Sequence, residues 1–237
     1  MERSVGNSPY GYAVVEGGMG ARAGAQFQMF ELRDGDCGRD ALSGWSDCEE
    51  DRSRAEVRTE REWRFGEDFW VGYSLFIPDG FPTSSVWTTI GQIHQNDLQG
   101  LPNDGGGIDR PNHMQLFLSG GRMGVAVWSL AGPRAQAQTF DLGRVSDWSG
   151  RWLDIQFHLD TRNANGLLEV YVDDRLVVDL PSTVTQRPSG YYFKYGIYIS
   201  GVSQWGGPIP TQRLYYDEVR IGDSRAEVVA DDRNPVD

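Results

Sequence analysis

The sequence predicts an all-β protein, a jelly-roll sandwich in which two large antiparallel sheets pack face to face. Its 237 residues include 8 Trp, 10 Tyr, 10 Phe and 30 Gly, a composition typical of strands joined by tight turns. The hydrophobic segments are short and alternate with a period of two residues, and no long segment has the period of an amphipathic helix. Sandwiches of this length commonly form one domain, so residues 1–237 are expected to be a single domain.

Several segments fit the strand pattern, and turn signals such as PDG at 78–80 and GG at 120–121 lie between them. These segments are 25–32, 53–63, 69–77, 87–94, 113–118, 123–129, 152–160, 167–172, 192–200 and 213–221. The clearest is 152–160, where Leu153, Ile155 and Phe157 face one side while Asp154 and Gln156 face the other. Residues 96–112 have no periodicity and are expected to form a long mobile loop after a strand.

The charge balance excludes some partners. The chain has 34 acidic and 22 basic residues and a formal net charge of -12, whereas general nucleic-acid binders carry a basic patch. No run of 18 apolar residues is present, so a transmembrane helix is not expected. The first residues, MERSVG, lack the apolar stretch of a secretory signal, so an intact precursor is not expected either. The sequence therefore predicts a soluble protein, expected to be a monomer, with no nucleic-acid or membrane partner.

The two cysteines, Cys37 and Cys48, lie in a polar stretch rich in Gly and Asp. A disulfide is favoured over two free thiols, because two cysteines with no histidine between them do not complete a zinc site. A disulfide suits a secreted or periplasmic protein whose signal has been removed.

A first strand carries an unusual set of charges on one face. Arg54, Glu56 and Arg58 alternate within 53–63 and project from the same side, about 6–7 Å apart in succession. A carboxylate between two guanidinium groups can hold both in place. The alternative is a charge ladder on an exposed sheet.

A second strand ends on an amide and an imidazole. Gln92 and His94 share a face of 87–94, directly before the expected loop. Histidine is the side chain most easily poised as an acid or base near neutral pH, so His94 is a candidate for catalysis. The alternative is a structural histidine, as is more common for a single His.

A third strand, 192–200, places Tyr192, Lys194, Gly196 and Tyr198 on one face. Lys194 is the only lysine of the chain, and the glycine beside it is expected to clear space for a sugar ring or another flat ligand. The alternative is an exposed strand rich in aromatic residues.

These three strands resemble motifs of the β-jelly-roll polysaccharide lyases, the group of alginate lyases, glucuronan lyases and heparin lyase I. The family motifs read roughly R-(S/T/A)-E-(L/V)-R, Q-(I/V)-H and Y-F-K-x-G-x-Y, and this chain has RAEVR at 54–58, QIH at 92–94 and YFKYGIY at 192–198. The segment GEDFWVGYSLFIP at 66–78 is similar to the heparin and glucuronan lyase branch, and YDEVRIG at 216–222 to the last strand of concanavalin-like sandwiches. The resemblance covers a core of about 25–222. It departs after Tyr198, where alginate lyases usually continue with Asn-Gln and this chain has Ile199 and Ser200.

The resemblance implies an enzyme that cleaves a 4-linked polyuronate by β-elimination, removing the C5 proton and expelling the oxygen on C4. Such a site must neutralise the uronate carboxylate, supply a base at C5 and supply an acid at O4. Gln92 and Arg54 suit the first task, and Tyr198 suits the acid. The base is His94 when the proton and the leaving oxygen lie on opposite sides of the ring, whereas Tyr198 alone can serve when they lie on the same side.

The resemblance also implies how the substrate, an acidic polysaccharide, is held. Lys194 and Arg58 would bind the carboxylates of flanking sugars, with Glu56 and Tyr192 beside them, so that a few cations line one groove of an acidic protein. No cofactor is required for this chemistry. A structural Ca²⁺ occurs in some relatives, but the sequence has no Asp-rich loop of recognisable spacing and predicts no metal ligands.

Glucuronan is the first choice of substrate, because of the segment 66–78 and the missing Asn-Gln; alginate or another uronic-acid polysaccharide is the alternative. Heparin is least expected, since sulfate recognition usually calls for more cations. Two other functions compete. A non-catalytic carbohydrate-binding sandwich needs only exposed aromatic residues, and a laminarinase-type glycoside hydrolase needs an E-x-D-x-x-E strand, which the sequence lacks.

Overall fold

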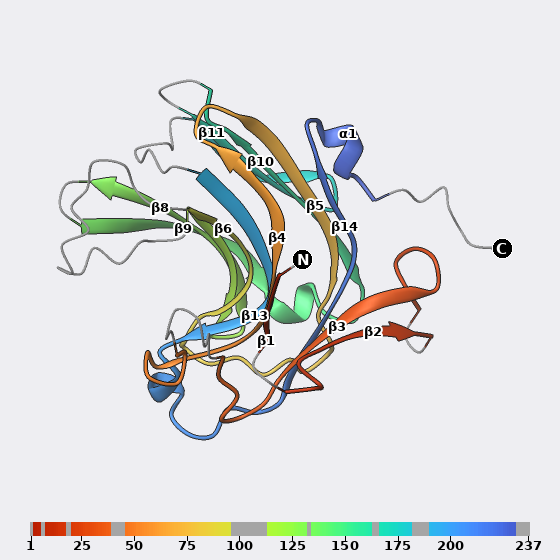
Figure 1. Cartoon of the computed structure of the whole chain (residues 1–237), viewed down its shortest axis with the longest axis vertical. Helices are drawn as coiled ribbons and strands as arrows, with labels where there is room; N and C mark the ends of the chain where they lie inside the picture. Colours follow the sequence, from red (N-terminus) through yellow and green to blue (C-terminus); the bar gives the residue numbers. More distant parts are fainter. Residues whose placement is uncertain are drawn as a thin grey trace.

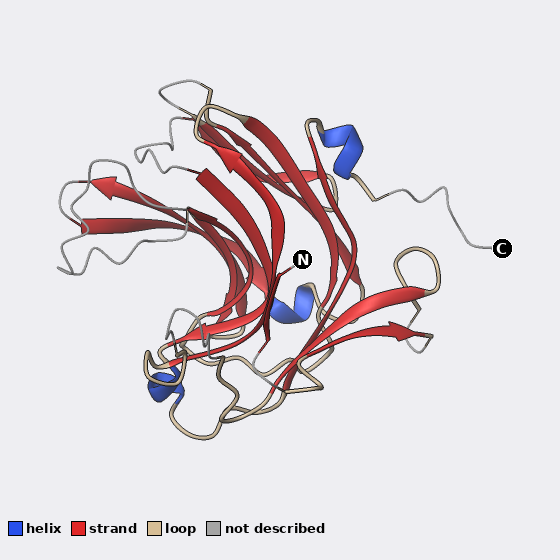
Figure 2. Ribbon diagram, in the orientation of Figure 1, coloured by secondary structure: helices blue, strands red, loops and turns tan. Residues whose placement is uncertain are grey.

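The fold is a sandwich of two seven-stranded antiparallel sheets, which confirms the predicted class (Figures 1 and 2). The computed structural model describes residues 2–5, 8–17, 20–38, 46–95, 113–131, 134–162, 166–181 and 190–230. The expected loop at 96–112 lies outside these residues.

We name the two sheets A and B. Sheet A contains, in spatial order, β1 (Glu2–Val5), β4 (Arg52–Arg64), β13 (Gly190–Ser200), β6 (Thr88–Gln95), β7 (Met114–Ser119), β8 (Arg122–Ala131) and β9 (Arg134–Arg144). Sheet B contains β12 (Arg175–Pro181), β11 (Leu167–Val172), β10 (Trp152–Asp160), β5 (Asp68–Phe76), β14 (Gln212–Gly222), β3 (Gln26–Leu32) and β2 (Tyr12–Glu16). Short helical turns occur at η1 (Val145–Asp147), η2 (Val202–Trp205) and α1 (Arg225–Val228).

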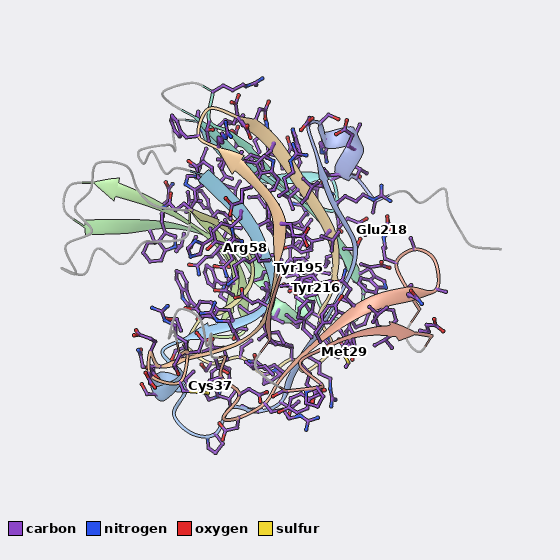
Figure 3. All side chains as sticks on the ribbon, viewed as in Figure 1. Met29, Cys37, Arg58, Tyr195, Tyr216 and Glu218 are labelled. Atoms are coloured by element: carbon purple, nitrogen blue, oxygen red, sulfur yellow. A yellow bond between two sulfur atoms is a disulfide. The ribbon has the colours of Figure 1, made fainter. Side chains whose placement is uncertain are left out.

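The core lies between the sheets and is built by the alternation seen in the sequence. Phe193 and Tyr195 from β13 are fully buried and face Phe157 and Tyr216 from sheet B. The Tyr216 hydroxyl crosses the sandwich and donates to the carbonyl oxygens of Ile90 and Gly196, at 2.6 and 2.9 Å. Figure 3 shows Tyr195 and Tyr216 between the sheets and Arg58 on the far side of sheet A. Polar alternate residues of β4, β6 and β13 are therefore directed to the outer face of sheet A.

Sheet A is curved, so that its outer face is concave (Figure 1). In Figure 1 its β4 and β13 strands pack along sheet B, whereas β8 and β9 extend away from sheet B toward the left of the view. The strands that carry the three sequence motifs, β4, β13 and β6, are neighbours in the sheet although they are far apart in the chain.

Candidate active site

Strand register brings the three predicted motifs into one patch. On one side of β13, Tyr198 lies opposite Arg54, Gly196 opposite Glu56, and Lys194 opposite Arg58. On its other side, Lys194 also lies opposite Gln92, and Tyr192 opposite His94. Residues directly opposite one another in adjacent strands point to the same face. The candidate catalytic and substrate-binding residues of the sequence thus share the outer face of sheet A, which we call the outer-face site.

Glu56 is the centre of the outer-face site. Its Oε2 accepts from the Lys194 ammonium at 2.7 Å, and its Oε1 accepts from the Gln92 amide at 2.5 Å. Arg54 Nη1 lies 3.6 Å from the same carboxylate. Glu56 and Gln92 are each 1% exposed and Lys194 is 6% exposed. Burial lowers the pKa of Lys194, although Glu56 opposes this shift. The carboxylate therefore orders three strands of the site through buried hydrogen bonds.

Arg54 is held in place by Asp47, a residue outside the predicted set. Asp47, which is 1% exposed, accepts from Arg54 Nε at 2.6 Å and from Nη2 at 2.7 Å, a bidentate pair. The guanidinium lies over the Tyr198 ring, 4.6 Å from its centre. Burial raises the pKa of Tyr198, so its hydroxyl is protonated at neutral pH and able to act as an acid.

Asp47 is itself placed by a covalent link. The structure joins Cys37 and Cys48 in a disulfide with the Cα atoms 5.3 Å apart, as the sequence favoured. The Asp47 amide donates to the Gly38 carbonyl at 2.9 Å, beside this bridge. The disulfide thus fixes the turn that carries the partner of Arg54.

His94 is neutral, and one of its ring nitrogens can accept a proton. Its Nδ1 lies 2.9 Å from the Gln95 carbonyl oxygen, and since a carbonyl can only accept, Nδ1 carries the proton and Nε2 the lone pair. Burial, aided by the positive charge of Lys194, lowers its pKa to about 3. The ring stacks on Tyr192 with the centroids 4.8 Å apart. Arg58 lies over the same Tyr192 ring, 3.9 Å from its centroid, and pairs with Glu62.

Two residues that sequence reasoning missed extend the site across sheet A. Gln115 on β7 lies opposite Gln92, and its amide donates to Thr89 at 3.1 Å. Trp128 on β8 donates from its indole nitrogen to Gln115 at 2.9 Å. Their outward positions in 113–118 and 123–129 were the only available signal, because alternation identifies a face but not the residues that meet on it.

The role expected for Gly196 is wrong. A Cβ at this position would lie 2.3 Å from the Ala55 carbonyl oxygen and 2.9 Å from the Phe30 ring, and the backbone has φ of +127°. Glycine is required here because β4 and the core approach closely, so it does not clear space for a ligand.

The other two histidines lie outside the site. His113 is 1% exposed, and neither ring nitrogen has a partner among the described residues. Burial lowers its pKa to about 4. On sheet B, His158 contacts Asp68 and Glu169 at 2.8 and 2.7 Å.

Solved alginate lyases share the sandwich: a family 7 alginate lyase, A1-II′, in complex with product has 14% identity and a TM-score of 0.58 over 92% of this chain and 84% of that one. Alginate lyase AlgAT5 of polysaccharide lyase family 7 has 16% identity and a TM-score of 0.55, covering 92% and 83%. Alginate lyase AlyC3 in complex with dimannuronate has 13% identity and a TM-score of 0.53, covering 83% and 74%. The fold is therefore that of the alginate lyases.

The family follows from the sequence. The polysaccharide lyase family model matches residues 19–220, and the chain belongs to this family of enzymes. No curated protein sequence matches it. Membership of this enzyme family argues against the two alternative functions, a non-catalytic carbohydrate-binding module and a glycoside hydrolase.

The described residues contain no group of three or more His, Cys, Asp or Glu side chains arranged to hold a metal ion. Within the same part of the chain, no helix is long and apolar enough to cross a membrane.

Proposed function

We propose that the outer-face site catalyses β-elimination in a 4-linked polyuronate. The observation that carries the proposal is the convergence of Arg54, Gln92, His94 and Tyr198 from three adjacent strands. Together they supply the three functions that the reaction needs, namely carboxylate neutralisation, a base and an acid.

Arg54 and Gln92 neutralise the uronate carboxylate. Asp47 occupies Nε and Nη2 of Arg54, and Nη1 is directed to the Glu56 side of the site. Gln92 donates one amide hydrogen to Glu56 and retains a second hydrogen that can donate to a substrate oxygen. Both donors stabilise the negative charge that moves onto the carboxylate when the C5 proton leaves.

Tyr198 and His94 move the protons. Tyr198 donates its hydroxyl proton to O4 as the bond from C4 to O4 breaks and the C4–C5 double bond forms. On a uronate whose C5 proton and O4 lie on opposite sides of the ring, His94 Nε2 takes the C5 proton. On a uronate where both lie on one side, Tyr198 serves both steps: its hydroxyl proton first passes to solvent, and its oxygen then takes the C5 proton and returns that proton to O4.

For the substrate we propose glucuronan first, because of the resemblance of 66–78 to the glucuronan lyase branch. Alginate is the second candidate, because solved alginate lyases share the fold and AlyC3 is in complex with dimannuronate. Lys194, Arg58 and Tyr192 stand beside the catalytic residues, where flanking sugars would lie, and Glu56 holds Lys194 there.

Two further expectations accompany this proposal. The disulfide supports a secreted or periplasmic location, because disulfides persist in oxidising compartments. The elimination itself needs no cofactor, and the reaction is assayed with and without Ca²⁺ to test for a structural ion.

The test is a panel of glucuronan, polymannuronate, polyguluronate, hyaluronan and heparin, incubated with purified protein. A lyase creates a conjugated double bond at the new non-reducing end, so ultraviolet absorbance should rise with glucuronan or alginate. Reducing ends that form without absorbance indicate hydrolysis. Absence of both signals on every polymer, with and without Ca²⁺, contradicts the proposal.

A further inference from the structure

A group of aromatic side chains lies beside the outer-face site, contributed by the residue before β6 and by β7 and β8. The Trp87 ring stacks on Phe117 with the centroids 4.1 Å apart and an angle of 5° between the planes. Trp128 lies 6.3 Å from Trp87, at 60°. Phe117 is 9% exposed, whereas both indoles are half-buried and keep part of their surface accessible. We call Trp87 and Trp128, with Phe117 stacked against Trp87, the aromatic platform.

The platform is rigidly supported. Phe117 lies against β8 where Gly124 has no side chain, since a Cβ there would be 2.7 Å from the end of the Phe117 ring. Trp87 then rests on Phe117. Trp128 is fixed by its hydrogen bond to Gln115, which is in turn bonded to Thr89. Rings that are held before binding lose little conformational freedom when a ligand arrives.

The platform is continuous with the outer-face site. Lys194, Gln92, Gln115 and Ala126 form one cross-strand row through β13, β6, β7 and β8. Three strand spacings separate the ends of this row, a distance of about 14 Å. Trp128 follows Ala126 by two residues and contacts Gln115, so it lies on the same face as the row. A chain of sugars that crosses the strands from the catalytic residues therefore reaches the platform.

We propose that the aromatic platform is a binding subsite for a pyranose ring of the substrate, distant from the bond that is cleaved. The chemistry favours a sugar because each pyranose ring has C–H groups that pack on an aromatic surface, while its hydroxyls can reach polar neighbours such as Gln115. Stacking contacts the sugar ring and not its carboxylate. Affinity should therefore depend on whether the oligosaccharide is long enough to reach this subsite. The inference rests on the proposed function, because the subsite is placed relative to the bond that the outer-face site would cleave.

The test compares Trp128→Ala and Trp87→Ala with Trp152→Ala, a half-buried indole on sheet B that serves as a matched control. Rates are measured on the polyuronate that the wild type cleaves fastest and on its oligosaccharides of increasing length. We expect KM to rise about three- to tenfold for long chains, with little change for the shortest chains that are cleaved. Trp152→Ala should match the wild type on all of them.

A second measurement separates this proposal from the proposed function. Binding of the same oligosaccharides is followed by tryptophan fluorescence and calorimetry, with Trp128→Phe included because it keeps an aromatic surface if Trp128→Ala does not fold. Weaker binding of long chains by the platform variants supports the subsite even if no elimination product forms. Equal KM and equal affinity of wild type and folded platform variants at every length overturn it, even if lyase activity is present.

Discussion

The Tyr198 hydroxyl is the proposed acid of the elimination. Its ring lies under the Arg54 guanidinium, and burial keeps the phenol protonated. Tyr198→Phe preserves the ring contact and removes only the transferable proton. We expect turnover to fall by a factor of about 10²–10⁴, the usual contribution of a positioned acid or base. Steady-state rates on the best substrate, with unfolding curves as the folding control, provide the measurement; near-wild-type kcat would refute the role of Tyr198.

His94 should make stability depend on pH. Its pKa is about 3 in the folded protein against 6.5 ordinarily, so between these values the unfolded chain binds the proton more tightly. The free energy of unfolding should therefore fall as pH decreases from about 6.5, and His113, with a pKa of about 4, acts in the same direction. Urea unfolding at pH 7 and pH 5 should show a smaller loss for His94→Gln than for the wild type. Equal losses would contradict the half-buried, neutral state of His94.

Alternation along single strands predicted the face on which each candidate residue lies, and the resemblance to the polysaccharide lyases grouped these residues into one site. The register of β4, β13 and β6 brings Arg54, Gln92, Lys194 and Tyr198 together. Sequence could not predict Asp47, because its contact with Arg54 comes from a turn between a cysteine bridge and a strand. Contacts made by irregular segments have no periodic signal.

At the scale of elements, the disulfide connects stability to the site. The bridge spans 11 residues, so replacing both cysteines by Cys37→Ser and Cys48→Ser should lower the free energy of unfolding by about 2–3 kcal/mol. Because Asp47 precedes Cys48 and holds Arg54, kcat should also fall while the variant is still folded. Chemical unfolding and rates at a temperature well below the unfolding midpoint would check this. A stable variant with unchanged kcat would separate the bridge from the positioning of Arg54.

Gly196 tests whether close packing of β13 on β4 requires a bare backbone. Gly196→Ala should destabilise by about 1–3 kcal/mol, because its Cβ would meet the Ala55 carbonyl and its φ is positive. Gly206→Ala is the matched control, since Gly206 has φ of +87° but open space around it. The two variants are compared by denaturant unfolding. Similar losses in both would show that only backbone conformation matters at Gly196.

The four strands that the sequence pattern did not predict, β1, β2, β9 and β12, all lie at sheet edges. β2 and β12 are the edge strands of sheet B, β1 and β9 those of sheet A. An edge strand pairs on one side only and tolerates polar residues on both faces, as RAQAQTFDLGR in β9 shows. The interior strands were predictable because their inward residues must fill a common core, which forces the alternation.

For the whole molecule, the charge of the site differs from a simple cationic groove. Among the described side chains named above, the positive and negative charges are equal in number. The cations are Arg54, Arg58 and Lys194, and the carboxylates are Asp47, Glu56 and Glu62. The chain as a whole has a formal net charge of -12, so it repels an acidic polysaccharide at long range.

This balance predicts an unusual response to salt. Raising ionic strength from about 10 to about 150 mM shortens the screening length to about 8 Å and weakens the long-range repulsion. We expect KM for the polymeric substrate to decrease over this range, with kcat nearly constant. Initial rates at graded NaCl, with a short oligosaccharide of low charge for comparison, provide the measurement. A steady increase of KM with salt would show that attraction by local cations prevails.

The pairing of β4, β13 and β6 also has a consequence for how the protein acquires activity. These neighbours come from residues 52–64, 190–200 and 88–95, so the chain must close two long loops before they meet. Pairing of strands distant in sequence is slow, because loop-closure entropy is lost before the contacts form. The candidate catalytic residues therefore do not assemble on any short fragment of the chain. The proposed site is complete only when β13, the strand that precedes the C-terminal strand β14, is in place, which ties the proposed function to completion of the fold.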